Sequence, residues 1–242
     1  MDFKPVIIIP ARYTSERLPA KALCLIGQKT LIRHVWERAI ATKLGPVFVA
    51  TDHVLIQQEV ASWGGQVLMT AQTCPTGSDR VAQACQMIKH DYNVVINIQG
   101  DLPFVDPSQV AHVLQPLSQG FDVGTLIANM PIEKRQDPNC VKAIVTHQES
   151  SVSRCHWFCR AALPYGAYHV GIYAYTPAAL KVYAQHQQSP YEKIERLEQL
   201  RFLEMGYQMG ASTINQTPLE VNSPQDLEAV ILYKENEHTK NT

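Results

Sequence analysis

The segment VIIIPARYTSERLPAK, residues 6–21, constrains the fold of this chain more than any other part of it. It opens with four apolar residues, VIII, and such a run without polar alternation is typical of a buried strand in a parallel sheet. The loop that follows leaves the carboxyl end of this strand, which is where open α/β sheets bind their ligands. Because the loop carries three cations, Arg12, Arg17 and Lys21, the segment predicts a polyphosphate or nucleotide site at the first β-α turn.

This loop differs from the two common phosphate-binding loops. It matches neither GxxxxGK[ST] nor GxGxxG, and it contains no glycine. Phosphate contact would therefore depend on the three cations and on backbone N–H groups. A solvated basic loop without a ligand is the alternative that the segment by itself leaves open.

The composition is that of a globular protein with a hydrophobic core. The chain has 242 residues, of which 45% are apolar, enough for one large α/β domain or two small ones. A net charge of −1 argues against a general nucleic-acid surface. No segment reads as a signal peptide or a membrane span, so we expect a cytoplasmic protein with no nucleic-acid or membrane partner. The six cysteines are scattered, and Cys155, His156 and Cys159 lack the second pair that a structural zinc site needs.

Strand and helix patterns alternate through the first half of the chain. The expected strands are residues 6–10, 46–50, 66–69, 93–98 and 122–127, and the expected helices are 31–41, 54–63, 78–90 and 107–117. The third of these helices has Ser78 or Asp79 as its expected N-cap. This order predicts an α/β fold with a doubly wound, mainly parallel sheet.

The regular alternation of strand and helix patterns ends at about residue 130. Strands are expected at 141–146, 168–175 and 208–214, with a long helix at 189–205 and a terminal helix at 224–236. We therefore predict a single domain, residues 1–242, whose main part comprises about 1–129 and 206–242. Residues 130–205 would form a smaller lobe on it.

Two further segments carry residues suited to a nucleotide. In NIQGDLP, residues 97–103, Asp101 lies just past an apolar strand, and a carboxylate facing a triphosphate needs a cation such as Mg²⁺ between them. Gly100 would let the backbone approach a ligand closely. In TGSDR, residues 76–80, Arg80 lies at a helix start and would reach a phosphate or a base edge. An ordinary turn and an ordinary capping segment are the alternatives for the two segments.

Seven segments in matching order resemble the 3-deoxy-manno-octulosonate cytidylyltransferases, the CMP-Kdo synthetases of Gram-negative bacteria. They are IIIPARYTSERLPAK, VATD at 49–52, TGSDR, NIQGDLP, DPNCVKAI at 137–144, HVGIYAY at 169–175 and ERLEQLRFLEMGY at 195–207. The resemblance covers nearly the whole chain. ARxxSxRLPxK is shared with other nucleotidyltransferases, whereas HVGIYAY, and LEQLRFLE together with QGD, are more specific to this family.

The resemblance implies a nucleotide-diphospho-sugar transferase-like fold, with a nucleotide part and a sugar-binding and dimerisation lobe at 130–205. It implies transfer from CTP to a 2-keto-3-deoxy sugar acid for lipopolysaccharide biosynthesis, with Mg²⁺ as cofactor and a homodimer as the assembly. The implied CTP contacts are Pro10, Ala11, Arg12, Ser15, Lys21, Arg80, Gln99 and Gly100. The implied sugar-acid contacts are Arg160, His169, Tyr173, Glu198 and Gln199, the metal ligands Asp101 and Asn222, and the catalytic residues Arg12, Lys21 and Asp101.

The chain departs from the family pattern at four places. Thr14 and Ala20 stand where the family usually has glycine, Leu102 replaces a glutamate, and the loop after Arg160 is much shorter. Asn222 replaces the second magnesium aspartate, and an amide oxygen ligates Mg²⁺ without charge. These departures leave two alternatives open: a cytidylyltransferase for another sugar acid, such as 8-amino-Kdo or a nonulosonate, and a nucleotide-binding homologue of low activity.

Overall fold

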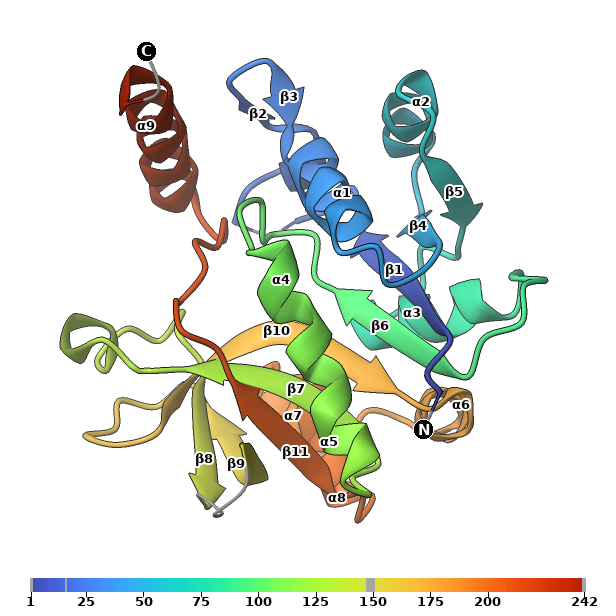
Figure 1. Ribbon diagram of the computed structural model, residues 1–242, viewed down its shortest axis with the longest axis vertical. Helices are drawn as coiled ribbons and strands as arrows, with labels where there is room; N and C mark the ends of the chain where they lie inside the picture. Colours follow the sequence, from blue (N-terminus) through green and yellow to red (C-terminus); the bar gives the residue numbers. More distant parts are fainter. Residues whose placement is uncertain (1, 16, 147–150, 241–242) are drawn as a thin grey trace. The chain divides into compact units, whose positions relative to one another are not determined.

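The computed structural model describes residues 2–15, 17–146 and 151–240, with side chains up to residue 236 in the last helix (Figure 1). The chain forms two compact units. Unit 1 comprises residues 1–6, 89–97 and 108–217, and unit 2 comprises residues 7–88, 98–107 and 218–242. Residues 108–129 and 206–217 thus belong to the unit that holds the predicted smaller lobe, whereas the single-domain organisation stays a prediction.

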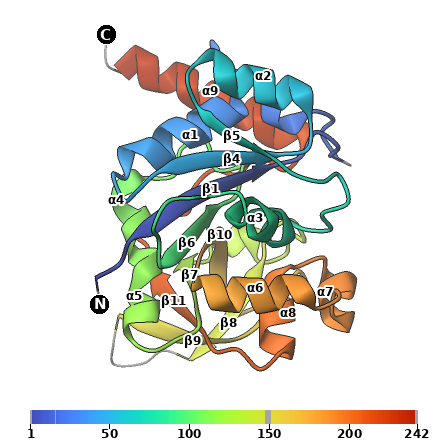
Figure 2. The ribbon, with the colours of Figure 1, turned by 90° about the vertical axis from the view of Figure 1, so that its right-hand side faces the viewer.

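Unit 2 contains the parallel β-α layers that the first half of the sequence predicts. Strands β1 (Pro5–Ala11), β4 (Val47–Thr51) and β5 (Gln66–Met69) pair in parallel in the order β5-β4-β1, with Ile9 opposite Val49. Helices α1 (Leu31–Ala41) and α2 (Val54–Ser62) lie in the connections between these strands, and α3 (Gly77–Cys85) follows β5. Helices α1 and α3 lie on opposite faces of these strands (Figure 2). The parallel pairing brings the carboxyl ends of the three strands to one edge, where their loops begin.

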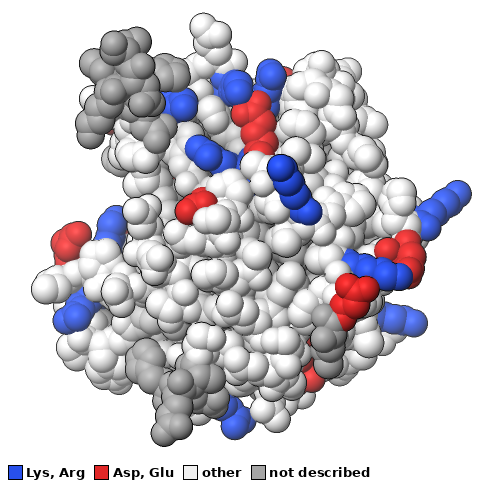
Figure 3. All heavy atoms as spheres, viewed as in Figure 1, with Lys and Arg blue, Asp and Glu red and all other residues white. Residues whose placement is uncertain are grey.

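Short elements complete unit 2 around the first loop. They are the 3-10 helix η1 (Lys21–Leu23), the hairpin of β2 (Leu25–Ile26) and β3 (Lys29–Thr30), and the terminal helix α9 (Pro224–Lys240). Lys29 and Arg33 both form ion pairs with Glu37. Basic and acidic side chains are likewise intermixed on the face shown in Figure 3.

Unit 1 does not continue the parallel pattern. Its strands are β6 (Val94–Ile98), β7 (Val123–Ala128), β8 (Lys142–Thr146), β9 (Val152–Cys159), β10 (Ala167–Tyr175) and β11 (Met209–Thr213). Among the strands from β7 to β11, the β7–β11 pair is parallel, while β10–β7, β11–β9, β9–β8 and β10–β8 are antiparallel. These five pairings close a ring of strands, so the expectation of a mainly parallel sheet is wrong for this unit. Antiparallel neighbours can be joined by short loops, and β9 had no counterpart among the expected strands.

The helices of unit 1 lie on both sides of these strands. Helix α5 (Gln115–Ser118) packs on β7 and β11, and Figure 2 shows α6 (Pro177–Gln185), α7 (Pro190–Glu195) and α8 (Gln199–Glu204) on the other side. The single helix expected at 107–117 consists of three short pieces, α4 (Pro107–Val110), η2 (Ala111–Leu114) and α5. No helix in the described ranges is both long and apolar enough to cross a membrane.

The long helix expected at 189–205 is also wrong, because the chain turns between α7 and α8. Arg196 has a φ of 54°, in the left-handed region that ends helices. The turn lets Arg201 fold back onto Glu192 with a distance of 2.7 Å, and both side chains are 1% exposed. The Arg201 guanidinium also lies 3.9 Å from the centre of the Tyr183 ring. A buried ion pair and an aromatic face therefore determine the path of this segment.

Candidate active site

The cationic loop ends at Lys21, which links two distant segments of unit 2. Its ammonium group donates to Asp101 Oδ2 and to the carbonyl of Val221, each at 3.0 Å. The N–H of Val221 donates in turn to the carbonyl of Asp101 at 3.0 Å. The segment that carries Asn222 therefore lies beside Asp101. A cation, a carboxylate and a backbone carbonyl meet at the edge where β1 ends.

The backbone just before Lys21 has the conformation that a glycine would favour. Ala20 has a φ of 50° and a ψ of 33°, in the left-handed region. An L-residue there costs roughly 1–2 kcal/mol relative to its usual conformations. The chain thus tolerates a left-handed backbone at Ala20, the residue directly before Lys21.

Asn222 is held with its amide oxygen toward a second cation of the loop. Its Oδ1 accepts from the Arg17 guanidinium at 3.2 Å, and its Nδ2 donates to Glu220 at 3.1 Å. Asp226 fixes the backbone by accepting from the N–H of Asn222 at 2.9 Å. This oxygen is a neutral donor of the kind that hard cations accept.

The donor set fits a magnesium ion that is held mainly by its substrate. Asp101 would supply one charged ligand and Asn222 an amide oxygen, and Mg²⁺ is usually bound by one or two carboxylates together with phosphates and water. The Asp101 carboxylate, 23% exposed, already has the Lys21 ammonium as a cationic partner. Within the described ranges, no three His, Cys, Asp or Glu side chains cluster as a metal site would require.

Gly100 is required by the protein's own backbone. A Cβ at this position would lie 2.9 Å from the carbonyl oxygen of Pro10, at the end of β1. The observed neighbour of Gly100 is a strand, so the close approach of a ligand to Gly100 stays a prediction. Pro10 and Ala11 are buried in β1, whereas Ser15 and Gln99 are half-buried.

Arg12 and Arg80 lie in contrasting environments. Arg12 is exposed, and it has no ion pair with any residue in the described part of the chain. Arg80, only 3% exposed, pairs with Asp52 at 2.9 Å and donates to Thr70 at 2.5 Å. Its helix begins with Thr76 as the N-cap, so the expected cap at Ser78 or Asp79 is wrong. The role of Arg80 as a nucleotide contact stays a prediction, because its guanidinium is directed at protein groups.

Arg160 at the end of β9 in unit 1 is also bonded to the backbone. Its Nε donates to the carbonyl of Glu195 at 3.1 Å, and its Nη1 donates to the carbonyls of Pro138 and Asn139 at 3.1 and 3.3 Å. These carbonyls belong to the DPNCVKAI turn and to the end of α7. A sugar carboxylate would have to displace these carbonyls from the Arg160 guanidinium or bind to its remaining N–H donors.

His169 in β10 is buried and neutral. Burial, together with the nearby charge of Arg160, lowers the pKa of His169 to about 3. Thr125 lies 3.1 Å from its Nε2 and donates its own proton to the carbonyl of Ile172 at 2.9 Å. Since a hydroxyl has only one proton, the proton between the two groups belongs to Nε2 of His169, which donates to the Thr125 oxygen.

Tyr173 and Gln199 form a polar pair next to an aromatic stack. The Tyr173 hydroxyl donates to Gln199 Oε1 at 3.2 Å, and the Tyr173 ring stacks on Tyr175. Gln199 is 2% exposed, and its Nε2 has no hydrogen-bond partner among the described residues. A buried donor without a partner is costly, and an oxygen of a bound ligand would satisfy it.

Glu198 lies beside this pair. It is the N-cap of α8, and its carbonyl accepts from Tyr183 at 3.3 Å. Glu198 and Gln199 therefore stand at the start of a short helix and not inside the long one that we expected.

Asp52 had no predicted function, although it is part of VATD, one of the segments that carry the family resemblance. Its position just past a strand, as for Asp101, was a feature that could have identified it. Arg17, by contrast, was noted as a loop cation, and its partner Asn222 was reached only through the fold.

Comparison with known proteins places this geometry in a family. The model of the cytidylyltransferase family matches residues 6–213. A 3-deoxy-manno-octulosonate cytidylyltransferase of Bartonella henselae is 40% identical over 238 residues, covering 95% of this chain and 98% of that protein. The chain belongs to the 3-deoxy-manno-octulosonate cytidylyltransferase family. A relative with the same name from Methylorubrum populi is 41% identical over 233 residues, covering 93% of this chain and 94% of the relative.

A solved structure of this family has the same fold. The CMP:2-keto-3-deoxy-manno-octonic acid synthetase complexed with CTP superposes with a TM-score of 0.87 at 34% identity, covering 97% of this chain and 99% of that chain. The family membership and the nucleotide-diphospho-sugar transferase-like α/β fold are therefore confirmed. The individual site residues stay predictions, and the geometry above defines what each of them can do.

Proposed function

We propose that this enzyme activates Kdo with CTP, giving CMP-Kdo and pyrophosphate for lipopolysaccharide biosynthesis. The observation that carries the proposal is the contact of Lys21 with Asp101 and Val221, in a chain of the Kdo cytidylyltransferase family. A fixed ammonium group at the end of a parallel strand suits a nucleotide triphosphate. This cation is held before any ligand binds, so its charge needs no reorganisation during the reaction.

The reaction is a displacement at phosphorus that needs no nucleophilic side chain. The anomeric hydroxyl of the sugar acid forms a bond to the α-phosphorus of CTP and releases its proton to solvent water. The bond to the bridging oxygen breaks, and its electron pair leaves with pyrophosphate. Catalysis of such a transfer rests on positioning and charge neutralisation. Lys21 and the exposed Arg12 would neutralise the charge that develops on the departing pyrophosphate.

The metal requirement is part of the proposal. Asp101 and the amide oxygen of Asn222 would hold a Mg²⁺ ion, which would neutralise phosphate oxygens.

Residues of unit 1 would bind the sugar acid. The unpartnered Gln199 Nε2 would donate to a sugar oxygen, with Tyr173 keeping the amide oriented. Arg160 would attract the sugar carboxylate by charge, and Glu198, the residue before Gln199, would accept from a sugar hydroxyl. His169 is neutral and hydrogen-bonded to Thr125, so it would contact the sugar acid as a neutral hydrogen-bonding group and not as a cation.

A panel of sugar acids tests the function directly. Pyrophosphate release is measured with CTP and Mg²⁺ and with Kdo, 8-amino-Kdo or a nonulosonate as the acceptor. The proposal requires kcat/KM to be highest for Kdo. A higher value for 8-amino-Kdo or a nonulosonate would assign the enzyme to that sugar, in keeping with Asn222 and the short loop after Arg160. CTP binding without turnover for any acceptor, with Mg²⁺ or Mn²⁺, would favour the low-activity homologue.

The homodimer is proposed through the lobe at about residues 130–200. Four large apolar side chains in this range are exposed: Ile132 by 76%, Tyr165 by 60%, Tyr191 by 52% and Ile194 by 73%. Exposed apolar groups in this number favour burial against a partner. Light scattering at micromolar concentration is expected to give twice the mass of the chain, and a monomer would contradict the proposal. The cytoplasmic location stays a prediction from the sequence.

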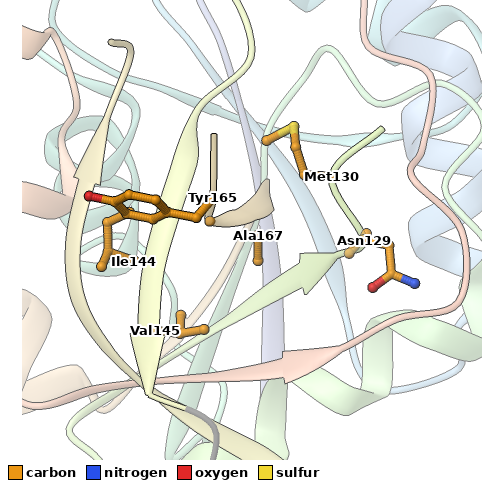
Figure 4. A pocket seen from close by; sticks show the side chains of 8 residues that line it. Asn129, Met130, Ile144, Val145, Tyr165 and Ala167 are labelled. Carbon is orange, nitrogen blue, oxygen red and sulfur yellow. The ribbon is translucent and has the colours of Figure 1, made fainter. Parts of the chain in front are cut away.

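Tyr165 also lines a pocket of about 300 Å³ in the same lobe. Its walls come from the ends of β7 and β8 and from the start of β10, and Tyr165 lies next to Ile144 (Figure 4). The short loop after Arg160 therefore contributes an exposed ring to this surface, and a Tyr165→Glu variant is expected to weaken the dimer.

A further inference from the structure

The carboxylate of Asp52 joins the cationic loop to the body of unit 2. Asp52 follows β4 directly, and its side chain is 9% exposed. Its Oδ1 accepts from the backbone N–H of Tyr13 at 3.0 Å, and its Oδ2 accepts from Arg80 Nη2 at 2.9 Å. Tyr13 is the residue directly after Arg12. One buried carboxylate thus holds both the loop backbone and helix α3.

Arg80 is itself fixed, so the anchor is rigid. Its Nη1 donates to the Thr70 hydroxyl at 2.5 Å and to the carbonyl of Ala71 at 3.4 Å. The Thr70 hydroxyl donates to the carbonyl of Thr51 at 3.0 Å, at the end of β4. Charge-assisted hydrogen bonds in a buried setting are about twice as strong as neutral ones. The ends of β4 and β5 and the start of α3 are therefore tied to the carboxylate that holds Tyr13.

The Tyr13 side chain supplies a second attachment beside the first. Its ring stacks on His53 with 3.8 Å between ring centres and 13° between ring planes. His53 is the N-cap of α2 and accepts from the N–H of Leu55 at 3.2 Å. Both the backbone and the ring of Tyr13 are thus held by two consecutive residues that follow β4.

We propose that Asp52 is a positioning residue for CTP, which acts by fixing the backbone at Tyr13 and thereby the direction of Arg12. The inference rests on the proposed function. Arg12 is exposed and has no ion pair within the described part of the chain, so its direction depends on the backbone that carries it. The loop also lacks the glycine pattern of the common phosphate loops. Without the anchor, CTP binding would have to order the loop, and that ordering lowers affinity.

The test compares Asp52→Ala and Asp52→Asn with a matched control. Alanine removes both hydrogen bonds, whereas asparagine keeps an oxygen for Tyr13 and loses the charge that faces Arg80. Glu59→Gln is the control, because Glu59 lies in the same unit and its carboxylate accepts from Thr30 and from Trp63. Calorimetry gives the Kd for CTP, and pyrophosphate release gives KM for CTP and for the sugar acid.

We expect Asp52→Ala to raise the Kd and KM for CTP about 10-fold or more, and Asp52→Asn to have a smaller effect in the same direction. The KM for the sugar acid should change less than about 2-fold in either variant. Glu59→Gln should lower Tm without raising the Kd for CTP. If Asp52→Ala does not fold, the Kd of Asp52→Asn for CTP alone decides whether Asp52 has this positioning role.

Two failures can be told apart. Unchanged CTP affinity in the folded Asp52 variants, with or without a lower Tm, would overturn the positioning role while the wild-type enzyme still binds CTP and turns over. Absence of CTP binding by the wild-type enzyme would refute the proposed function, and the inference with it.

Discussion

Replacement of Lys21 by alanine separates the chemistry of this site from its stability. The ammonium group makes two contacts of 3.0 Å, to Asp101 and to Val221, and the two charged side chains are 21% and 23% exposed. Partial exposure screens this ion pair, so its loss should cost only about 1 kcal/mol of folding free energy. Loss of a fixed charge contact to the transition state should cost on the order of 10²-fold or more in kcat.

The assay is the initial rate of pyrophosphate release at saturating CTP and sugar acid, with a thermal melt of the same sample. Lys29→Ala is the matched control, because Lys29 lies in the same unit, pairs with Glu37 at 2.8 Å and takes no part in the proposed site. The control should retain its rate. A folded Lys21→Ala enzyme working near the wild-type rate would refute the argument that this ammonium group stabilises the departing pyrophosphate.

Three further predictions concern the metal, a buried ion pair and pH. Asn222→Asp should lower the Mg²⁺ concentration that gives half-maximal activity, since the charge of the ligand rises. Without Mg²⁺ the variant should have a lower Tm, because Glu220 lies 3.1 Å from the amide nitrogen of Asn222. Unchanged metal dependence and an unchanged rate would show that this position is not a metal ligand. Arg201→Met should cost about 3–5 kcal/mol in denaturant unfolding by stranding Glu192, with part regained on adding Glu192→Gln. Burial lowers the pKa of His169 from its ordinary 6.5 to about 3. Between these two pH values only the unfolded chain binds a proton at this imidazole, so the stability of the folded protein falls as the pH falls. From pH 7 to pH 5, wild type should therefore lose about 2 kcal/mol more than His169→Phe, and parallel losses would contradict a buried neutral imidazole.

The nucleotide half of the fold was largely predictable because its signals are local. The apolar run at the start of β1 and the helical spacing of α1 lie within single segments, and the predicted bounds of α1 and β5 agree with the structure. Parallel pairing follows from the alternation of strands and helices, because a helix that connects two strands of one sheet forms a right-handed crossover between parallel strands. The loop cations and Asp101 could therefore be assigned to one edge of a sheet before any contact was known.

The second half was predicted less well because its structure depends on contacts between distant residues. The helix pattern at 189–205 is continuous in sequence, yet the ion pair of Arg201 with Glu192 and the turn at Arg196 divide it. The strand β9 alternates too little to stand out, and its place follows from pairing with β8 and β11. Tertiary packing overrides local propensity at such positions.

The sequence by itself determined the chemistry that this chain carries: a cationic loop after a buried strand, a carboxylate after another, and enough family-specific segments to indicate a Kdo cytidylyltransferase. Only the tertiary structure decided which groups meet. It joined Lys21 to both Asp101 and Val221, turned Arg80 toward Asp52, and buried the Gln199 amide nitrogen where no described residue is its hydrogen-bond partner. The reason is physical, since hydrogen bonds and ion pairs form over about 3 Å, whereas the residues concerned lie tens to hundreds of positions apart in the chain.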